Sequence, residues 1–396
     1  MATAADTADG RRHAGWLPDQ QGVEAWLTGH RERVADEQPD ELHPAVAGFG
    51  RLIDTDPVVR MLVTRMLEEV PHTRQYSERH VRDVPEMLRL IDAVMTSAPQ
   101  FSRDSMVMTP IGAILDWASG TRAGFEAFRD PRVNAALKDV LDAWCRFLDS
   151  PDSRYVLTDS PGGWRSPEAR EAVGIDQFEH DPDDEHWGFA SWNDFFTRRF
   201  REDARPVAAP DDDAVVVSPC ESTPYAISHD VKATDEFWVK SEPYSLQDML
   251  AGDPSVDDFV GGTVYQAYLS ALNYHRWHSP VSGTVVRAFN VGGTYYSEAD
   301  SLGASAVEPQ HSQGYLAHVA ARAVIVLEAD DPAIGQVAFV PVGMSDVSSC
   351  LIGDGIAPGR HVTKGDELGR FQFGGSTCCL VFRRGVVASL DRKSVV

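Results

Sequence analysis

Apolar residues in the first part of the chain recur at the spacing of an amphipathic helix. Between residues 59 and 70 they fall at i, i+3, i+4, i+7, i+8 and i+11, directly after Asp56-Pro57. An aspartate N-cap followed by proline at the first helical position is a common helix start. Residues 130–148 repeat both the Asp-Pro start and the single apolar face. Because such faces must be buried against other elements, residues 1–150 are predicted to form a helical N-terminal domain.

From about residue 191 the pattern changes to short valine-rich runs separated by Gly, Pro and Asp, which are typical of strands in an antiparallel sheet or barrel. The runs that we interpret as strands are 214–217, 283–291, 322–328, 336–342 and 377–382. Residues 151–190, rich in Pro, Gly and Asp, are interpreted as a connecting segment. The pattern therefore predicts an α+β protein, with a helical N-terminal domain followed by a mostly antiparallel, barrel-like β domain over residues 191–396.

The charge balance narrows the choice of partners. Lys and Arg number 36 against 60 Asp and Glu, which gives a formal net charge of -24 at pH 7. Such a surface repels nucleic-acid phosphates and anionic lipid headgroups alike. A small soluble molecule is therefore the expected partner, with neither nucleic acid nor membrane bound.

The sequence also bears on location. No stretch approaches the roughly 20 apolar residues that a membrane-spanning helix requires. Residues 1–10 are small and acidic, without the apolar segment of a signal peptide. The cytoplasm is therefore the expected location.

Neither disulfides nor a bound metal are expected. The cysteines are odd in number and scattered, and no C-x-x-C pair marks a zinc site. They are Cys145, Cys220, Cys350, Cys378 and Cys379, all interpreted as free thiols. An acidic run at 181–185 has a histidine on either side, but such runs are usually solvated surface rather than metal ligands.

The first segment with chemical potential is Gly374-Gly375-Ser376. A serine after two glycines sits where the backbone can take unusual dihedrals, as attack of its hydroxyl on the preceding carbonyl requires. Taken alone, the segment reads more simply as a glycine turn that enters a strand. The nucleophile elbow of hydrolases, G-x-S-x-G, is excluded because Cys378 stands where its second glycine belongs.

Three further segments carry candidate side chains. His275 and His278 lie three residues apart, and either could act as a base near neutral pH or be a structural histidine. Glu221 follows a strand-like run and by itself resembles an ordinary exposed glutamate. Aromatic residues beside Arg198 and Arg199 indicate a helix packed on a neighbour, with its cations outward.

In combination and in order, these segments resemble the phosphatidylserine decarboxylase family. The shared motifs are F-F-x-R…A-R-P, S-P-x-acid, Lys240 with residues 244–246, Y-H-R-x-H-x-P-x-x-G and F-G-G-S-T, over residues 192–382. Over nearly the whole chain the sequence is similar to one branch, the pyruvoyl-dependent L-tryptophan decarboxylases of fungi. The helical-region segments that match this branch are 15–17, 56–59, 121–125 and 152–154. Membrane-bound members usually carry Asp where Glu221 stands.

The resemblance implies a self-processing enzyme. The chain would cut itself between Gly375 and Ser376, and Ser376 would become a covalent pyruvoyl cofactor. By match to the family motif, His278 would be the base for this step, with Glu221 orienting it. We interpret His275 as a proton donor or carboxylate contact during decarboxylation. The large and small fragments are expected to remain associated.

The resemblance also suggests the substrate, a free and most simply aromatic L-amino acid, with L-tryptophan converted to tryptamine. One alternative is a true phosphatidylserine decarboxylase that makes phosphatidylethanolamine, which the net charge disfavours. A further alternative is an unprocessed, non-enzymatic β-barrel binding module. Trp238, Tyr295 and Tyr296 could line a substrate pocket or belong to the core. The sequence leaves open the oligomeric state, the role of the helical domain and whether Glu221 fully replaces aspartate.

Overall fold

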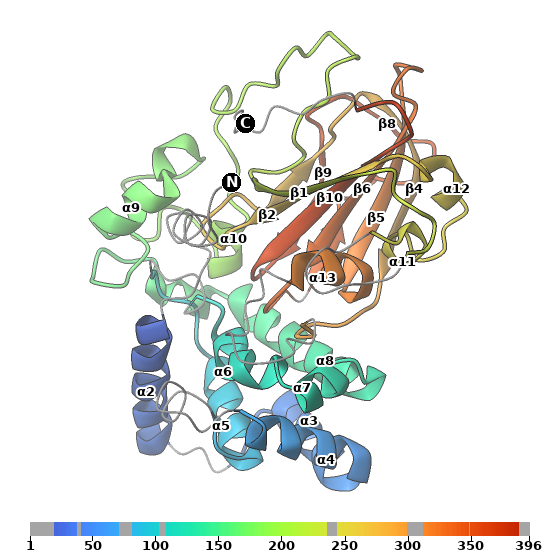
Figure 1. Cartoon of the computed structure of the whole chain (residues 1–396). Coiled ribbons are helices and arrows are strands. Elements are labelled where there is room, and N and C mark those ends of the chain that lie inside the picture. Colours follow the sequence, from blue (N-terminus) through green and yellow to red (C-terminus); the bar gives the residue numbers. More distant parts are fainter. Residues whose placement is uncertain are drawn as a thin grey trace, which may run out of the picture. The chain divides into compact units, whose positions relative to one another are not determined.

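The computed structural model divides the chain into two compact units, a helical unit and a sheet unit (Figure 1). The structure describes residues 20–37, 41–70, 81–102, 108–235, 244–298, 312–347 and 349–387. The helical unit comprises residues 1–174, 180–195 and 294–312, and the sheet unit comprises 175–179, 196–293 and 313–396. The expected segments at 15–17, Trp238 and Lys240 lie outside the described residues.

The helical unit forms as the apolar periodicity predicts. Its helices are α2 (Gln20–Glu37), α3 (Pro44–Thr55), α4 (Pro57–Glu68), α5 (Val84–Val94), α6 (Pro110–Ser119), α7 (Arg122–Ala127) and α8 (Pro131–Leu148). The Asp56 carboxylate caps α4 by accepting from the Val58 and Val59 amides, and Asp130 caps α8 in the same way. The predicted apolar faces of α4 and α8 are buried.

Residues 151–190, expected as a connection, carry short helices of their own. These are η1 (Pro151–Val156), α9 (Pro167–Val173) and η2 (Ile175–Gln177), and α10 (Trp192–Phe196) follows them. Most of the segment belongs to the helical unit, while residues 175–179 belong to the sheet unit.

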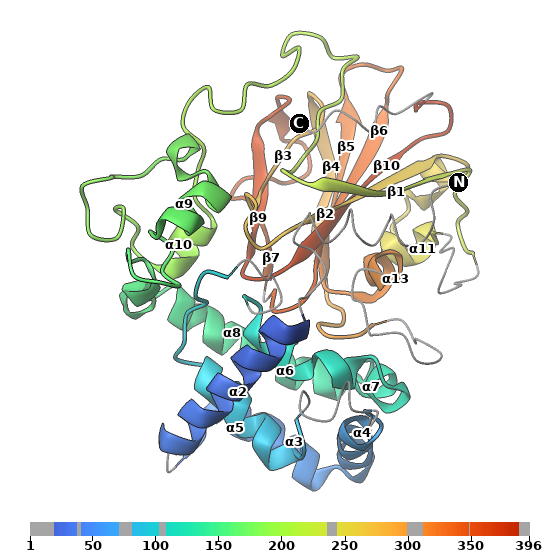
Figure 2. The ribbon, with the colours of Figure 1, turned by 60° about the vertical axis from the view of Figure 1, so that its left-hand side comes forward.

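The sheet unit contains a seven-stranded antiparallel sheet in the order β1-β2-β10-β6-β5-β4-β8 and a three-stranded sheet in the order β3-β9-β7 (Figure 2). The larger sheet is built from β1 (Thr223–His229), β2 (Thr263–Leu269), β4 (Gly283–Val291), β5 (Arg322–Ala329), β6 (Gln336–Gly343), β8 (His361–Val362) and β10 (Ser376–Phe382). The smaller is built from β3 (Arg276–His278), β7 (Ser349–Ile352) and β9 (Glu367–Gln372).

The α+β class and the antiparallel sheet are confirmed, but the barrel-like shape is wrong. In the described residues β1 pairs only with β2, and the two-residue β8 pairs only with β4, so the larger sheet has two edges and stays open. The predicted strand at 214–217 is also wrong, since these residues form no strand. The other four predicted strands correspond to β4, β5, β6 and β10.

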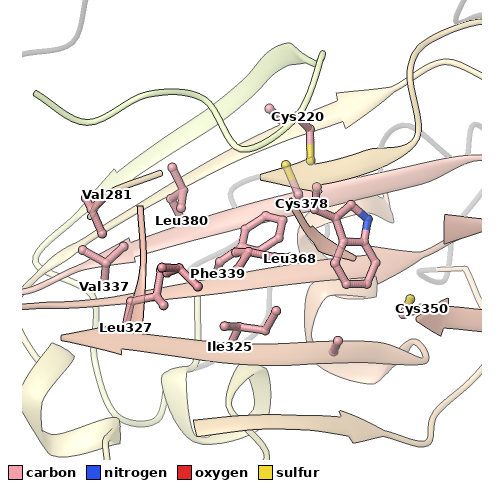
Figure 3. Close-up of a cluster of buried hydrophobic side chains, with 14 of the residues drawn as sticks. Cys220, Val281, Ile325, Leu327, Val337, Phe339, Cys350, Leu368, Cys378 and Leu380 are labelled. Atoms are coloured by element: carbon pink, nitrogen blue, oxygen red, sulfur yellow. The ribbon is translucent and has the colours of Figure 1, made fainter. Parts of the chain in front are cut away.

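Strand β10 lies inside the larger sheet, between β2 and β6, and is covered on both faces. Every one of its seven residues is buried. Helix α13 (Gln313–Val319) packs on one face, where Thr377 Oγ1 donates to Gln313 Oε1 at 3.0 Å (Figure 1). On the other face Cys378 and Leu380 join an apolar cluster with side chains such as Phe339 (Figure 3). Because side chains alternate along a strand, Ser376 lies on the same face as Cys378.

Candidate active site around Ser376

Ser376 begins β10 with its side chain completely enclosed. The residue is 0% exposed, and among the described residues its Oγ has no hydrogen-bond partner. An unpaired buried hydroxyl costs free energy and is rare in folded proteins, so it calls for an explanation. On the face where Ser376 lies, the apolar cluster includes Trp277 from β3 and Phe371 from β9. The smaller sheet, which carries the histidine motif, therefore packs on the face where Ser376 lies.

The backbone of Gly375 is held by two hydrogen bonds, and the one to its carbonyl belongs to the Gly375–Ser376 peptide. The Gly375 N–H donates to Ser345 O, and the Met344 N–H donates to Gly375 O, both at 3.0 Å. Gly374 takes a φ of +135°, and a Cβ there would lie 2.2 Å from Ser345 O. Only glycine fits at 374, because a side chain would meet both the strained φ and this backbone oxygen. By contrast, a Cβ on Gly375 would meet nothing within 4 Å.

Both ring nitrogens of His278, at the end of β3, have partners. Nδ1 lies 2.7 Å from Gly365 O, and Nε2 lies 2.7 Å from the Tyr274 hydroxyl. Because a carbonyl only accepts, Nδ1 carries the proton and Nε2 accepts from the Tyr274 O–H. Burial lowers the pKa of His278, so the ring is neutral at pH 7.

Glu221 reaches the same region without bonding His278. Its Oε2 accepts from the Tyr274 backbone N–H at 3.1 Å, and its Oε1 pairs with Arg205 at 2.9 Å. The preceding residue, Cys220, lies beside Cys378 in the same apolar cluster, so this segment packs on β10 two residues beyond Ser376 (Figure 3). Glu221 and His278 therefore meet through Tyr274.

Tyr274 is the residue that the sequence reasoning missed. It opens the Y-H-R-W-H run, so its position in the motif was the available signal. Burial raises the pKa of its phenol well above the usual range, which keeps the hydroxyl protonated and able to donate to His278.

His275 is wholly buried and differs from His278 in its contacts. Its ring stacks on Phe196 at a centroid distance of 4.0 Å, and Nδ1 donates to Asn273 O at 2.8 Å. Among the described residues Nε2 has no hydrogen-bond partner. Burial, assisted by the positive charge of Arg198, lowers the pKa of His275 to about 3. The imidazole is therefore neutral and offers a lone pair at Nε2.

The aromatic-arginine segment packs directly against the histidine motif. Arg198 is 3% exposed and donates to Leu272 O at 2.8 Å, with its guanidinium 4.3 Å from the centre of the Phe178 ring. The expectation that both cations point outward is thus wrong for Arg198, whose charge is stabilised by a carbonyl and an aromatic face. The Arg276 Nε donates to Thr197 O at 2.7 Å and joins the same two segments.

The remaining candidates belong to the helical unit or show no ligand geometry. Tyr295 and Tyr296 are buried in the helical unit, where Tyr296 packs on Phe128. The five cysteines are free thiols, as expected. Within the described ranges, no group of three or more His, Cys, Asp and Glu side chains could hold a metal ion. No helix in the part of the chain that the structure describes is long and apolar enough to cross a membrane.

Comparison with known proteins decides the family. Two family models, both described as phosphatidylserine decarboxylase, match residues 43–173 and 192–395. The chain belongs to the phosphatidylserine decarboxylase family. Its relatives include the decarboxylase iboD of Amanita muscaria, 42% identical over 74% of this chain and 91% of the relative. As a member of this family with such relatives, the chain is a decarboxylase.

Two kinds of named relative differ in how much of this phosphatidylserine decarboxylase family member they match. The L-tryptophan decarboxylase of Psilocybe cubensis is 32% identical over 98% of this chain and 92% of its own length. Phosphatidylserine decarboxylase proenzyme 3 of Schizosaccharomyces pombe is also 32% identical, but over 51% of this chain and 20% of its own length. The similarity to the tryptophan enzyme thus extends over both units.

Proposed function

We propose that the chain cuts itself between Gly375 and Ser376 to form a pyruvoyl group, and then decarboxylates a free aromatic L-amino acid, most simply L-tryptophan. The observation that carries the proposal is the buried Ser376 hydroxyl, unpaired among the described residues, beside a peptide whose carbonyl is held by the Met344 N–H. Relatives named as proenzymes and as L-tryptophan decarboxylases support the two halves of the proposal.

Self-cleavage needs a base, because a serine hydroxyl is a weak nucleophile without one. We assign this role to His278, which is neutral at pH 7 and presents its lone pair at Nε2. That lone pair accepts a hydrogen bond from the Tyr274 hydroxyl. For His278 to take the Ser376 proton, Tyr274 must therefore break this hydrogen bond or relay the proton to Nε2. Glu221 positions Tyr274 through the backbone N–H and thereby acts on His278 indirectly.

His275 is assigned to turnover rather than to self-cleavage. The pyruvoyl carbonyl supplies an electrophile for the substrate amine and an electron sink for loss of CO2. The His275 Nε2 has a lone pair and no proton at neutral pH, so it first accepts a hydrogen bond or a proton before it can donate one. The positive charge of Arg198 disfavours protonation of the ring, whereas an anionic partner such as a substrate carboxylate favours it.

Phosphatidylserine remains the second candidate substrate, because both matching family models carry that description. The net charge of -24 disfavours approach to an anionic membrane. The third alternative, a binding module without activity, is set aside because the chain is a decarboxylase by family and relatives.

Intact-protein mass spectrometry of the purified chain tests the proposal. We expect two fragments, the smaller beginning with a blocked pyruvoyl at position 376, while Ser376→Ala gives one uncut and inactive chain. Substrates are then screened by amine formation, beginning with L-tryptophan. A Ser376→Ala protein that still decarboxylated an amino acid would contradict the scheme.

A further inference from the structure

The turn that follows β6 hydrogen-bonds both backbone groups of Gly375, the residue before Ser376. Ser376 pairs with Gly343, the last residue of β6, so Met344 and Ser345 lie opposite Gly375. One of these residues donates an N–H to the Gly375 carbonyl, and the other accepts from the Gly375 N–H. The carbonyl of the peptide to be cut is thus held by a turn more than 25 residues earlier in the chain.

The turn is shaped for close approach to this peptide. Asp346 has a φ of +65°, in the left-handed region that few residues other than glycine adopt. A Cβ on Gly374 would lie 2.2 Å from Ser345 O and 2.7 Å from Val347 N. Strain at a non-glycine residue persists only where the surroundings enforce it, and it often accompanies function.

We propose that the Met344 N–H is an oxyanion donor for self-cleavage, and that the Ser345 carbonyl positions the peptide for attack. This inference rests on the proposed self-cleavage at Gly375 and Ser376. The Ser376 Oγ gives its proton to the base and bonds to the Gly375 carbonyl carbon, and the carbonyl π electrons move onto its oxygen. Met344 stabilises that negative oxygen. The oxygen then reforms the carbonyl, the C–N bond breaks and the nitrogen takes a proton, which leaves an ester.

A backbone donor in this place is effective for two reasons. The Met344 N–H already points at the Gly375 oxygen at 3.0 Å, so it needs no reorganisation when charge develops. Ser376 and Thr377 are 0% exposed, so the negative oxygen would develop beside a region from which water is excluded, where a hydrogen bond to a charge is stronger. Removing one donor of this kind typically slows a reaction by roughly 100- to 1000-fold.

The test replaces the donor while leaving Ser376 and the histidines in place. Met344→Pro removes the N–H and should slow the appearance of fragments from freshly synthesised chain by about 100-fold or more. Met344→Leu keeps the N–H and has a side chain of similar size, so it should be cut at the wild-type rate. Gly374→Ala, which pushes against Ser345 O, should also slow cleavage. Gly292→Ala is its matched control, because a Cβ there meets nothing within 4 Å.

Hydroxylamine separates this role from a structural or later one, because it cleaves an ester that has already formed. In Met344→Pro and Gly374→Ala we expect hydroxylamine to release little fragment, since the ester itself forms slowly. Fragment released in full by hydroxylamine would place the defect after ester formation and overturn the inference. Thermal unfolding of both variants is compared with that of Ser376→Ala to check that they fold. If Met344→Pro does not fold, the rate of fragment appearance and the hydroxylamine release of Gly374→Ala decide.

The outcomes distinguish this inference from the proposed function. If the wild-type chain is cut and both variants are cut at its rate, the oxyanion role is wrong and self-cleavage stands. If the wild-type chain is never cut, both the self-cleavage and the role of Met344 are wrong.

Discussion

At the scale of single residues, the two histidines of one motif meet different environments. His275 is buried flat against Phe196 with a free lone pair, whereas the lone pair of His278 is held by Tyr274. A lowered pKa keeps both rings neutral at pH 7. Neither ring is therefore a ready proton donor, and the acid residue Glu221 bonds the Tyr274 backbone N–H rather than a histidine.

This arrangement predicts how substitutions of Glu221 affect self-cleavage. Glu221→Gln keeps an oxygen that can accept from the Tyr274 N–H, so cleavage should slow by less than about tenfold, near the cost of weakening one charge-assisted hydrogen bond. Glu221→Ala removes the acceptor and should slow cleavage considerably more. The rates are measured by denaturing electrophoresis of freshly synthesised chain over time.

The alternative is a direct triad, in which Glu221 bonds and orients the base. In the trypsin triad, replacing the acid with its amide lowers kcat by about 10⁴ because the histidine takes the wrong tautomer. A loss of that size in Glu221→Gln would show that the carboxylate acts directly on His278 in the reacting state. Arg205→Gln is the matched control, since it removes the ion pair of Glu221 and leaves the contact with Tyr274.

At the scale of elements, the proposed cut falls at the first residue of β10, an interior strand of the larger sheet. All seven residues of β10 pair with β2 on one edge and with β6 on the other. Cutting before Ser376 removes none of these pairs, because the ladder begins at Ser376 itself. The strand is also buried along its full length.

We therefore predict that the two fragments stay together after cleavage. They should elute as one species in size-exclusion chromatography without denaturant and separate only after unfolding, because extracting β10 exposes a buried apolar strand and two open sheet edges. A small fragment that eluted separately under native conditions would show that β10 is not held as the structure describes.

The sequence predicted the elements whose signal is local. Helices α4 and α8 follow from Asp-Pro caps and a 3.6-residue period, and β10 from its apolar run. The open edges, the strand order and the short β3 depend on pairing between segments far apart in the chain, which periodicity does not encode. The candidate site likewise divides into features with a local sequence signal and features that depend on long-range contacts. The motif drew attention to the histidines, but the bonds of His278 to Gly365 O and of Arg198 to Leu272 O arise from folding alone.

At the scale of the whole molecule, charge and coverage bear on the substrate. The chain carries a net charge of -24, so an anionic vesicle repels it, whereas a free amino acid with no net charge is not repelled. Similarity to the tryptophan decarboxylase of Psilocybe cubensis covers 98% of the chain, against 51% for the phosphatidylserine decarboxylase proenzyme of Schizosaccharomyces pombe. Both observations favour a free amino acid over a lipid as the substrate.

We accordingly predict that the processed chain forms tryptamine from L-tryptophan and little phosphatidylethanolamine from phosphatidylserine vesicles. Amine release is measured for both, with Ser376→Ala as the blank. Phosphatidylserine dispersed in a neutral detergent separates chemistry from repulsion, because it dilutes the surface charge while keeping the same headgroup. If the dispersed lipid is turned over faster than L-tryptophan, the lipid is the substrate and charge merely limits access to vesicles. If neither form of the lipid reacts while L-tryptophan does, the site itself selects the free amino acid.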